Sequence, residues 1–308
     1  MSIFDIFKKK QEYELPQIYK GIISKDDYNI ILDFSLLYHK EQNLLVSKID
    51  EGEIVIEINN EIQHRYLDNL VRVLSGNEKL KWKEIIFDHF NKLKYNNSAF
   101  EYLYKDFEYA SQFLRVLIKG NNFNLGDDIS NYVHRIDFPD TNTFLVLEFE
   151  EQFHYILKDE ILEWEKTENE LFETALENIP QDEIEIKVYE FAEKFKVFSF
   201  TSGDYSSSFM INLKNKADYV IGNFGSLVAI PTKGTALVYP IETNNILELI
   251  EVIDPTIEKF YNEDPGNITQ NYYWFHNNKF RLFSTGTDED KKFIKLPEAL
   301  SEMFANKL

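Results

Sequence analysis

The sequence predicts an α+β protein, with a mainly helical N-terminal lobe packed on a lobe built around a mainly antiparallel β-sheet with flanking helices. Up to about residue 120, apolar residues recur mostly at spacings of three and four, which is the period of a helix. Beyond that point, short segments alternate apolar and polar residues and are joined by links of hairpin length. This pattern favours antiparallel strands over a doubly wound parallel sheet.

The boundary between the lobes is predicted in the polar, Gly-containing residues 121–131, which separate the two periodicities. The expected lobes are therefore residues 1–122 and 123–308. The connecting segment is short for a flexible linker, so we expect two packed lobes.

The N-terminal lobe begins with a predicted helix over residues 24–43, where Ser24 can cap the first turn. A hairpin follows over residues 44–58, with its turn at residues 50–52. Apolar stripes then predict three more helices. They span residues 64–76, 81–93 and 98–120. Gly76 ends the first of these helices and Gly120 ends the last.

The second lobe alternates strands with a few helices. A capping box of Thr167 and Glu170 predicts a helix that ends before Pro180. A second helix is expected from about Asn245, interrupted or kinked near Pro255, and a short one from Pro297. Strands are predicted over residues 132–137, 143–149, 183–191, 195–200, 209–213, 219–224, 226–232 and 236–242, with a hairpin over 272–284 that turns at Asn277-Asn278.

Composition limits the function. The chain has 308 residues, 44% of them hydrophobic, including 26 Phe and 18 Tyr, so it can build a core without disulfides or metals. It has no cysteine, which excludes a thiolate zinc site or a cysteine nucleophile and fits a reducing compartment. The formal charge of −20 disfavours binding to nucleic acid or to an anionic membrane and favours basic partners.

No signal peptide and no membrane span are expected, so a cytoplasmic location is predicted. Apolar residues 3–7 beside Lys8–Lys10 leave open a short helix that docks on a membrane surface or a partner.

Metal and cofactor signatures are missing from the sequence. The six histidines show no spacing that aims two imidazoles at one metal, and residues 222–235 lack the order of a phosphate-binding loop. Asp127, Asp128, His134 and Asp137 are the densest group of acids and imidazole, but His134 and Asp137 would point to opposite faces of a strand. No metal, no cofactor and no catalytic set are predicted.

The loop TSGDYSSS, residues 201–208, is the candidate ligand site. Its carboxylate and hydroxyls can donate and accept hydrogen bonds, and its Gly lets backbone amides approach a ligand. The alternative is a polar hairpin turn in which Asp204 or a serine bonds back to the chain. The candidate residues are Ser202, Gly203, Asp204, Tyr205 and Lys233, with His134 as a further member.

The order of segments in residues 130–240 resembles the DUF1444 (YtpQ-like) family. That family has a Trp followed by a helix ending in a Leu, Ala-Leu and Asn-Leu pattern, then a Thr-x-Asp-Gly-Tyr-Asp-Ala-Ser loop and a Val-Ala-x-Pro-x-Arg-Asp strand end. The matching positions here are Trp164, Leu171, Ala175, Leu176, Asn178 and Ile179, then TSGDYSSS and LVAIPTKGT.

This chain departs from the family pattern at its charged positions. No Gly follows Asp204, Ser206 stands where the second Asp would be, and Lys233-Gly234 replaces Arg-Asp. The resemblance implies an α+β architecture and a cytoplasmic bacterial origin, and it implies no reaction. If the charged groups form a site in the family, that site is lost or changed in this chain.

Two functions are expected from these observations. The first is a non-enzymatic, acidic protein-binding module whose partner is a basic protein, as an immunity protein neutralising a cationic toxin domain would be. The second is a small-molecule-binding or hydrolytic enzyme with its site around Asp204. The oligomeric state is not predicted.

Overall fold

The computed structural model describes residues 12–58, 61–103, 106–123, 125, 128–149, 152–264, 266–288 and 291–306. The possible docking helix over residues 3–10 and the predicted group member Asp127 lie outside these ranges. The fold is α+β, and the strand pairings within the described sheets are antiparallel, as predicted. None of the helices described is long and apolar enough to cross a membrane.

The chain divides into two compact units, Met1–Ser98 and Ala99–Leu308. This division lies upstream of the boundary predicted in residues 121–131. The reason is that β4 (Leu114–Gly120) pairs along its whole length with β6 (Thr141–Phe149), so residues on both sides of the predicted boundary share one sheet.

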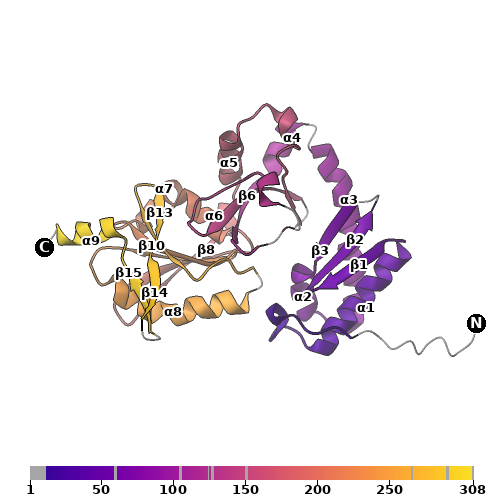
Figure 1. Cartoon of the computed structure of the whole chain (residues 1–308), viewed down its shortest axis with the longest axis horizontal. Helices are drawn as coiled ribbons and strands as arrows, with labels where there is room; N and C mark the ends of the chain where they lie inside the picture. The colour runs from indigo at the N-terminus through magenta and orange to yellow at the C-terminus, as the bar shows by residue number, and fades with distance from the viewer. Residues whose placement is uncertain are drawn as a thin grey trace, which may run out of the picture. The chain divides into compact units, whose positions relative to one another are not determined.

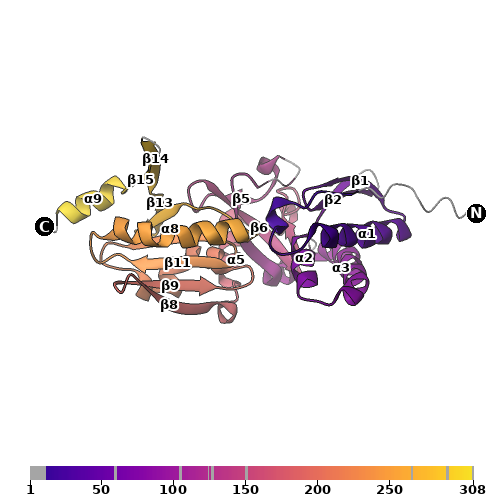
Figure 2. The same ribbon diagram turned by 90° about the horizontal axis from the view of Figure 1, so that it is seen from below.

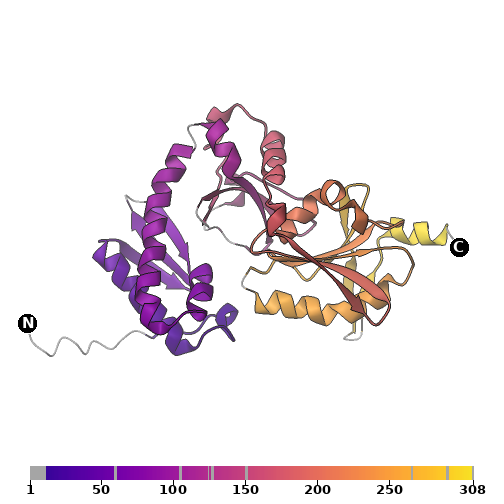
Figure 3. The same cartoon turned by 180° about the vertical axis from the view of Figure 1, so that it is seen from behind.

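The N-terminal unit packs helices on a three-stranded sheet (Figure 3). Helix α1 (Lys25–Glu41) begins at the predicted cap, where the Ser24 side chain accepts from the Asp27 amide. The predicted hairpin forms from β1 (Leu45–Asp50) and β2 (Glu53–Ile58). A third strand, β3 (Glu61–Tyr66), then pairs with β2.

The sequence pattern does not predict strand β3, because residues 64–66 fall within a predicted helix. Helix α2 (Asp68–Ser75) begins only after Leu67, the first of the buried residues at helical spacing, and it ends at Gly76 as predicted. Helix α3 (Trp82–Leu103) is one helix where two were predicted.

The predicted helix over residues 98–120 is wrong in its second half. The chain continues α3 to Leu103, forms the short α4 (Phe107–Ala110), and then enters strand β4. Side chains of β4 are buried on both faces of the strand. Its apolar run is short, with Val116, Leu117 and Ile118 lying between Arg115 and Lys119, and periodicity alone does not distinguish such a run from part of a buried helix.

The second unit contains two larger sheets (Figure 1). One has the order β4-β6-β5, with β5 (His134–Arg135), and its β7 (Gln152–Tyr155) also pairs with β6. The other has the order β13-β12-β10-β11-β9-β8. Its strands are β8 (Glu185–Phe191), β9 (Phe195–Thr201), β10 (Ser226–Thr232), β11 (Thr235–Pro240), β12 (Tyr272–His276) and β13 (Lys279–Leu282). A small hairpin joins β14 (Ser284–Asp288) and β15 (Lys291–Lys295).

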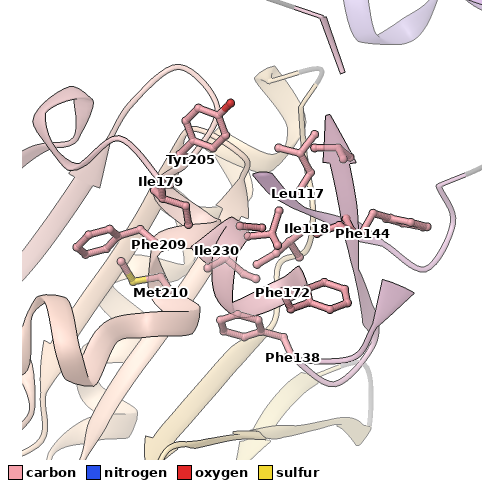
Figure 4. Packing of buried hydrophobic residues seen from close by; sticks show 14 of the residues in the cluster. Leu117, Ile118, Phe138, Phe144, Phe172, Ile179, Tyr205, Phe209, Met210 and Ile230 are labelled. Atoms are coloured by element: carbon pink, nitrogen blue, oxygen red, sulfur yellow. The ribbon is translucent and has the colours of Figure 1, made fainter. Parts of the chain in front are cut away.

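Each face of the six-stranded sheet buries a separate core. One face packs against α8 (Ile246–Glu263), which runs roughly along the strands in Figure 2, and against α9 (Glu298–Ala305). The other face shares a core with α5 (Glu168–Glu177), α6 (Ser206–Phe209), α7 (Leu213–Lys216) and the four-stranded sheet (Figure 4). Alternation along each strand produces this division, since successive side chains point to opposite faces.

The capping box of Thr167 and Glu170 is confirmed at the start of α5. Helix α8 begins after Asn245, as predicted, and continues through Pro255. The turn at Asn277-Asn278 is also confirmed, with φ of 52° and 57°. The predicted strands over residues 209–213 and 219–224 are wrong, because residues 209–220 form a series of short helical turns and residues 222–225 form a turn closed by a bridge between Gly222 and Gly225.

Candidate functional site

The loop over residues 201–208 connects a strand to a helix, and it is not the hairpin turn considered from the sequence. Strand β9 ends at Thr201, and α6 begins at Ser206. The Ser202 hydroxyl oxygen accepts hydrogen bonds from the backbone amides of Tyr205 and Ser206, both at 2.9 Å. The Ser206 hydroxyl donates to the same oxygen at 2.9 Å. Ser202 therefore fixes the turn that leads into α6, whose N-cap residue is Tyr205.

The other two serines attach the loop to neighbouring strands. The Ser207 hydroxyl donates to the Thr232 carbonyl at 2.5 Å, and the Ser208 hydroxyl donates to the Val116 carbonyl at 2.7 Å. Both serines are buried. Their hydroxyl protons are committed to main-chain oxygens, which is the usual state of buried polar groups. These serines stabilise the loop and do not present a nucleophile.

Asp204 and Lys233 form an ion pair between Oδ1 and Nζ. Their side chains are 29% and 16% exposed. The stem of Lys233 lies over Gly266, where a Cβ would come within 2.8 Å of the Lys233 Cγ. A glycine is needed at position 234 as well, because a Cβ there would lie 2.5 Å from the Ser202 carbonyl oxygen. The structure thus brings Ser202, Gly203, Asp204 and Lys233 close to one another.

Tyr205 is only 3% exposed and belongs to the core (Figure 4). Its ring makes an edge contact with Phe153. Burial, followed by interaction with the Glu148 carboxylate, raises the pKa of the Tyr205 phenol. Glu148 in turn pairs with Arg115, whose Nε lies 3.0 Å from Oε2. The phenol therefore keeps its proton at neutral pH and cannot act there as a general base.

His134 does not complete the loop site. Its Nδ1 lies 3.1 Å from the Tyr132 carbonyl oxygen, and its ring packs on Phe144. Asp137, its predicted neighbour, accepts from Arg135 Nε at 3.0 Å. Within the ranges that the structure describes, no group of three or more His, Cys, Asp or Glu side chains could hold a metal ion.

Two hollows among the described residues lie elsewhere and are not lined by the loop residues. One, of about 430 Å³, is lined by residues of α1 and β1 and the turn between them. The other, of about 210 Å³, lies beside α5. Its lining residues are Phe107, Lys166, Glu170, Glu173 and Thr174. The predicted site is therefore an ion pair in a well-bonded loop.

Neither family models nor curated proteins nor solved structures gave a match to this chain. The resemblance to the DUF1444 family stays a prediction. The functional argument consequently depends on the residues of this chain alone.

A second feature emerges when charge is placed on the fold. The Met1–Ser98 unit has 14 Lys and Arg against 16 Asp and Glu, a charge of −2. The Ala99–Leu308 unit has 19 against 37, a charge of −18. Residues 163–193, which we call the acidic segment, contain 11 Asp and Glu and two Lys, a charge of −9. This segment includes α5 and β8.

All the carboxylates of the acidic segment are exposed. They are Glu163, Glu165, Glu168, Glu170, Glu173, Glu177, Asp182, Glu183, Glu185, Glu190 and Glu193. Lys166, Lys187 and Lys216 pair with three of them. Counting charge along the sequence in short windows could have found the segment, whereas the total charge used in the sequence prediction could not.

A cluster of titratable groups in the N-terminal unit was not predicted either. His39 is fully buried, and its Nδ1 lies 2.6 Å from the Ser35 carbonyl oxygen. Its Nε2 lies 3.1 Å from Nη1 of Arg65, which is 7% exposed. Burial lowers the pKa of His39 to about 4. Burial also lowers the pKa of the nearby His89 to about 4, with a smaller contribution from Arg65.

Proposed function

We propose that this chain is a non-enzymatic, acidic protein-binding module that acts in the cytoplasm and takes a basic protein as its partner, in the manner of an immunity protein. The observation that carries the proposal is the acidic segment. Nearly half of the formal charge of −20 lies on residues 163–193, and every carboxylate there is exposed.

Exposed carboxylates concentrated in one segment of the chain speed the encounter with a positively charged partner and disfavour anionic ones. Most of those in the acidic segment are not neutralised by a lysine within ion-pair distance. Solubility alone requires a net charge but no particular location for it. The concentration of charge on α5 and β8 favours a binding surface.

The alternative, an enzyme with its site at Asp204, has less support. The serine hydroxyls of the loop bond to the chain, Asp204 is paired with Lys233, and Tyr205 faces the core. A catalytic site needs groups that are free to act on a substrate. We therefore do not extend this alternative.

The test is affinity capture from native lysate at low salt, with three forms of the protein. One is the wild type. The second removes four charges from the acidic segment, by Glu163→Gln, Glu165→Gln, Glu173→Gln and Glu183→Gln. The third removes four exposed charges from α8 and α9, by Glu251→Gln, Glu258→Gln, Glu298→Gln and Glu302→Gln.

We expect the wild type and the α8 and α9 variant to capture the same basic protein, and the acidic-segment variant to lose it. Raising the salt to about 1 M, where the screening length falls to about 3 Å, should release the partner. Capture of no basic protein by the wild type would contradict the proposed function. Equal loss in both variants would show that net charge matters and the segment does not.

A further inference from the structure

Strand β8 forms one edge of the six-stranded sheet, at its lower border in Figure 2. It pairs with β9 over seven consecutive residues, from Glu185 opposite Thr201 to Phe191 opposite Phe195, with no shift of register. An edge strand leaves alternate backbone N–H and C=O groups without a strand partner. Those groups form a template on which another strand can add.

The edge has few of the features that usually protect such strands. β8 contains no proline and no glycine, it has no bulge, and six of its seven residues are exposed. Natural edge strands are commonly short, bulged, covered, interrupted by proline or lined with charged side chains, and of these features β8 has only the charged side chains, at Glu185, Lys187 and Glu190. Lys187 is the one lysine within β8, and it pairs with Glu185 at 2.8 Å. The backbone of β8 is therefore accessible along the strand.

The side chains of β8 add apolar contact area on both faces of the edge. Ile186 and Val188 share one face, and they are 42% and 54% exposed. Val188 lies opposite Phe198, whose ring contacts that of the exposed Tyr219 at 5.8 Å. Tyr189 is 48% exposed on the other face. Apolar side chains flanking a free edge are the contacts that bind a strand added to a sheet.

Charge selects the kind of strand that fits. β8 and its flanking residues contain five acids and one lysine. The acids are Asp182, Glu183, Glu185, Glu190 and Glu193. A segment carrying lysine or arginine at alternate positions would place cations beside these carboxylates, and cross-strand pairs of opposite charge are stabilising.

We infer that β8 is the docking edge for an extended, basic segment of the partner protein, which adds to the sheet as a further strand beside β8. This inference rests on the proposed function and specifies how the basic partner is held. Backbone hydrogen bonds supply the alignment, Ile186, Val188 and Tyr189 supply apolar contacts, and the carboxylates favour a cationic segment.

A second copy of this chain is a less suitable occupant. Two β8 strands paired with each other would bring two sets of acidic flanks together, and like charges across a pair of strands are destabilising. We therefore assign the edge to a different protein and leave self-pairing as an outcome of the test.

The experiment uses two synthetic eight-residue peptides with blocked ends. In the first, lysine alternates with valine. In the second, lysine alternates with proline, which keeps the charge and the length but prevents pairing as a strand. Binding of each peptide to the full chain is measured by calorimetry at low salt. Amide hydrogen exchange is followed over residues 185–191.

Two variants complete the design. Ile186→Lys with Val188→Lys places on the edge the residue type that natural sheets use to prevent strand addition. Val73→Lys with Leu80→Lys makes the same change of charge at exposed apolar residues of the other unit. Because all four positions are exposed, both variants should keep the fold, which circular dichroism checks.

The lysine–valine peptide should bind the wild type and the Val73 and Leu80 variant equally, and it should slow exchange in β8. The lysine–proline peptide should bind the wild type at least about tenfold more weakly than the lysine–valine peptide does, which is the effect of losing two or more ordinary hydrogen bonds. The Ile186 and Val188 variant should bind the lysine–valine peptide more weakly than the wild type does, by a similar factor. Equal binding of both peptides without protection of β8 would overturn the added strand and leave acidic docking intact. Failure of the lysine–valine peptide to bind would overturn the added strand, whereas the capture experiment tests the proposed function separately. Sedimentation measures the oligomeric state of each protein. If the wild type forms a dimer and the variant Ile186→Lys with Val188→Lys does not, the edge pairs with a second copy of this chain.

Discussion

Acidification should destabilise the N-terminal unit through His39, and the His39→Gln variant isolates this effect. The imidazole lies in the core between α1, α3 and β3, with Arg65 at its Nε2 and the rings of Tyr38 and Phe90 beside it. Nδ1 donates to the Ser35 carbonyl, so Nε2 is the atom that accepts from Arg65. A proton added at Nε2 would remove this acceptor and face the guanidinium with a second positive charge.

The sign of the pH dependence follows from the lowered pKa. In the folded chain the pKa of His39 is about 4, against an ordinary value of 6.5. Above pH 6.5 both the folded and the unfolded chain hold the neutral imidazole, and the full stability is present. As the pH falls from 6.5 toward 4, the unfolded chain binds a proton that the folded chain does not bind, and stability is lost.

The magnitude follows from the same two values. Between pH 7 and pH 5, one such histidine lowers the free energy of unfolding by about 2 kcal/mol. His89 adds a similar or smaller loss, since its side chain is only partly buried. Most carboxylates titrate below this pH range, so the loss between pH 7 and pH 5 reports mainly on histidines.

Urea unfolding at pH 7, 6 and 5 measures the effect in the wild type and in His39→Gln. Gln can replace both hydrogen bonds, but it does not titrate. The variant should be less stable than the wild type at pH 7, because it loses the aromatic contacts, yet its loss between pH 7 and pH 5 should be smaller by about 2 kcal/mol. Equal losses in the two proteins, or an NMR titration of His39 with a midpoint above pH 6, would refute the reasoning.

Three further predictions concern the loop over residues 201–208, and urea unfolding measures each of them. Asp204→Ala should lower the free energy of unfolding by about 1 kcal/mol, because the partly buried Lys233 amine loses its carboxylate; an unchanged value would contradict the ion pair. Gly234→Ala should lower the free energy of unfolding by about 2 kcal/mol or more, because the new Cβ would meet a backbone carbonyl. Gly203→Ala should change it by no more than about 0.5 kcal/mol, because the space around Gly203 is open. Similar costs for the two glycines would show that the loop is not held as described. Ser208→Ala should cost about 1 kcal/mol through its buried hydrogen bond to β4, and full stability would show that this bond contributes nothing.

The sequence was sufficient for elements whose ends are fixed by local chemistry. The Thr167 and Glu170 capping box, the Asn277-Asn278 turn and the Ser24 cap satisfy backbone groups within a few residues, so the signal and the structure lie in the same short stretch. Strand β4 shows the opposite case. Its residues look helical by spacing, and only pairing with β6 determines that they form a strand.

Part of the site could be predicted from the order of its segments. That Ser202, Asp204 and Lys233 lie together follows from the adjacent turns after β9 and between β10 and β11. The direction of Tyr205 could not be predicted, because it depends on Glu148 and Arg115 from strands that are distant in the sequence. The His39 and Arg65 contact was missed likewise, since it joins a helix to a strand 26 residues later.

The two surfaces of the second unit have different chemical roles, and this difference connects the fold to the proposed function. In the loop, nearly every polar group has a partner within the chain, so a ligand there would have to break existing bonds. At β8, the outer backbone edge has no strand partner among the described residues, and most of the nearby carboxylates form no ion pair with a lysine. Binding at the edge replaces contacts with solvent, whereas binding at the loop replaces contacts within the protein. We therefore expect the proposed partner to gain more free energy at β8 than at Asp204, even though the loop has the more distinctive sequence.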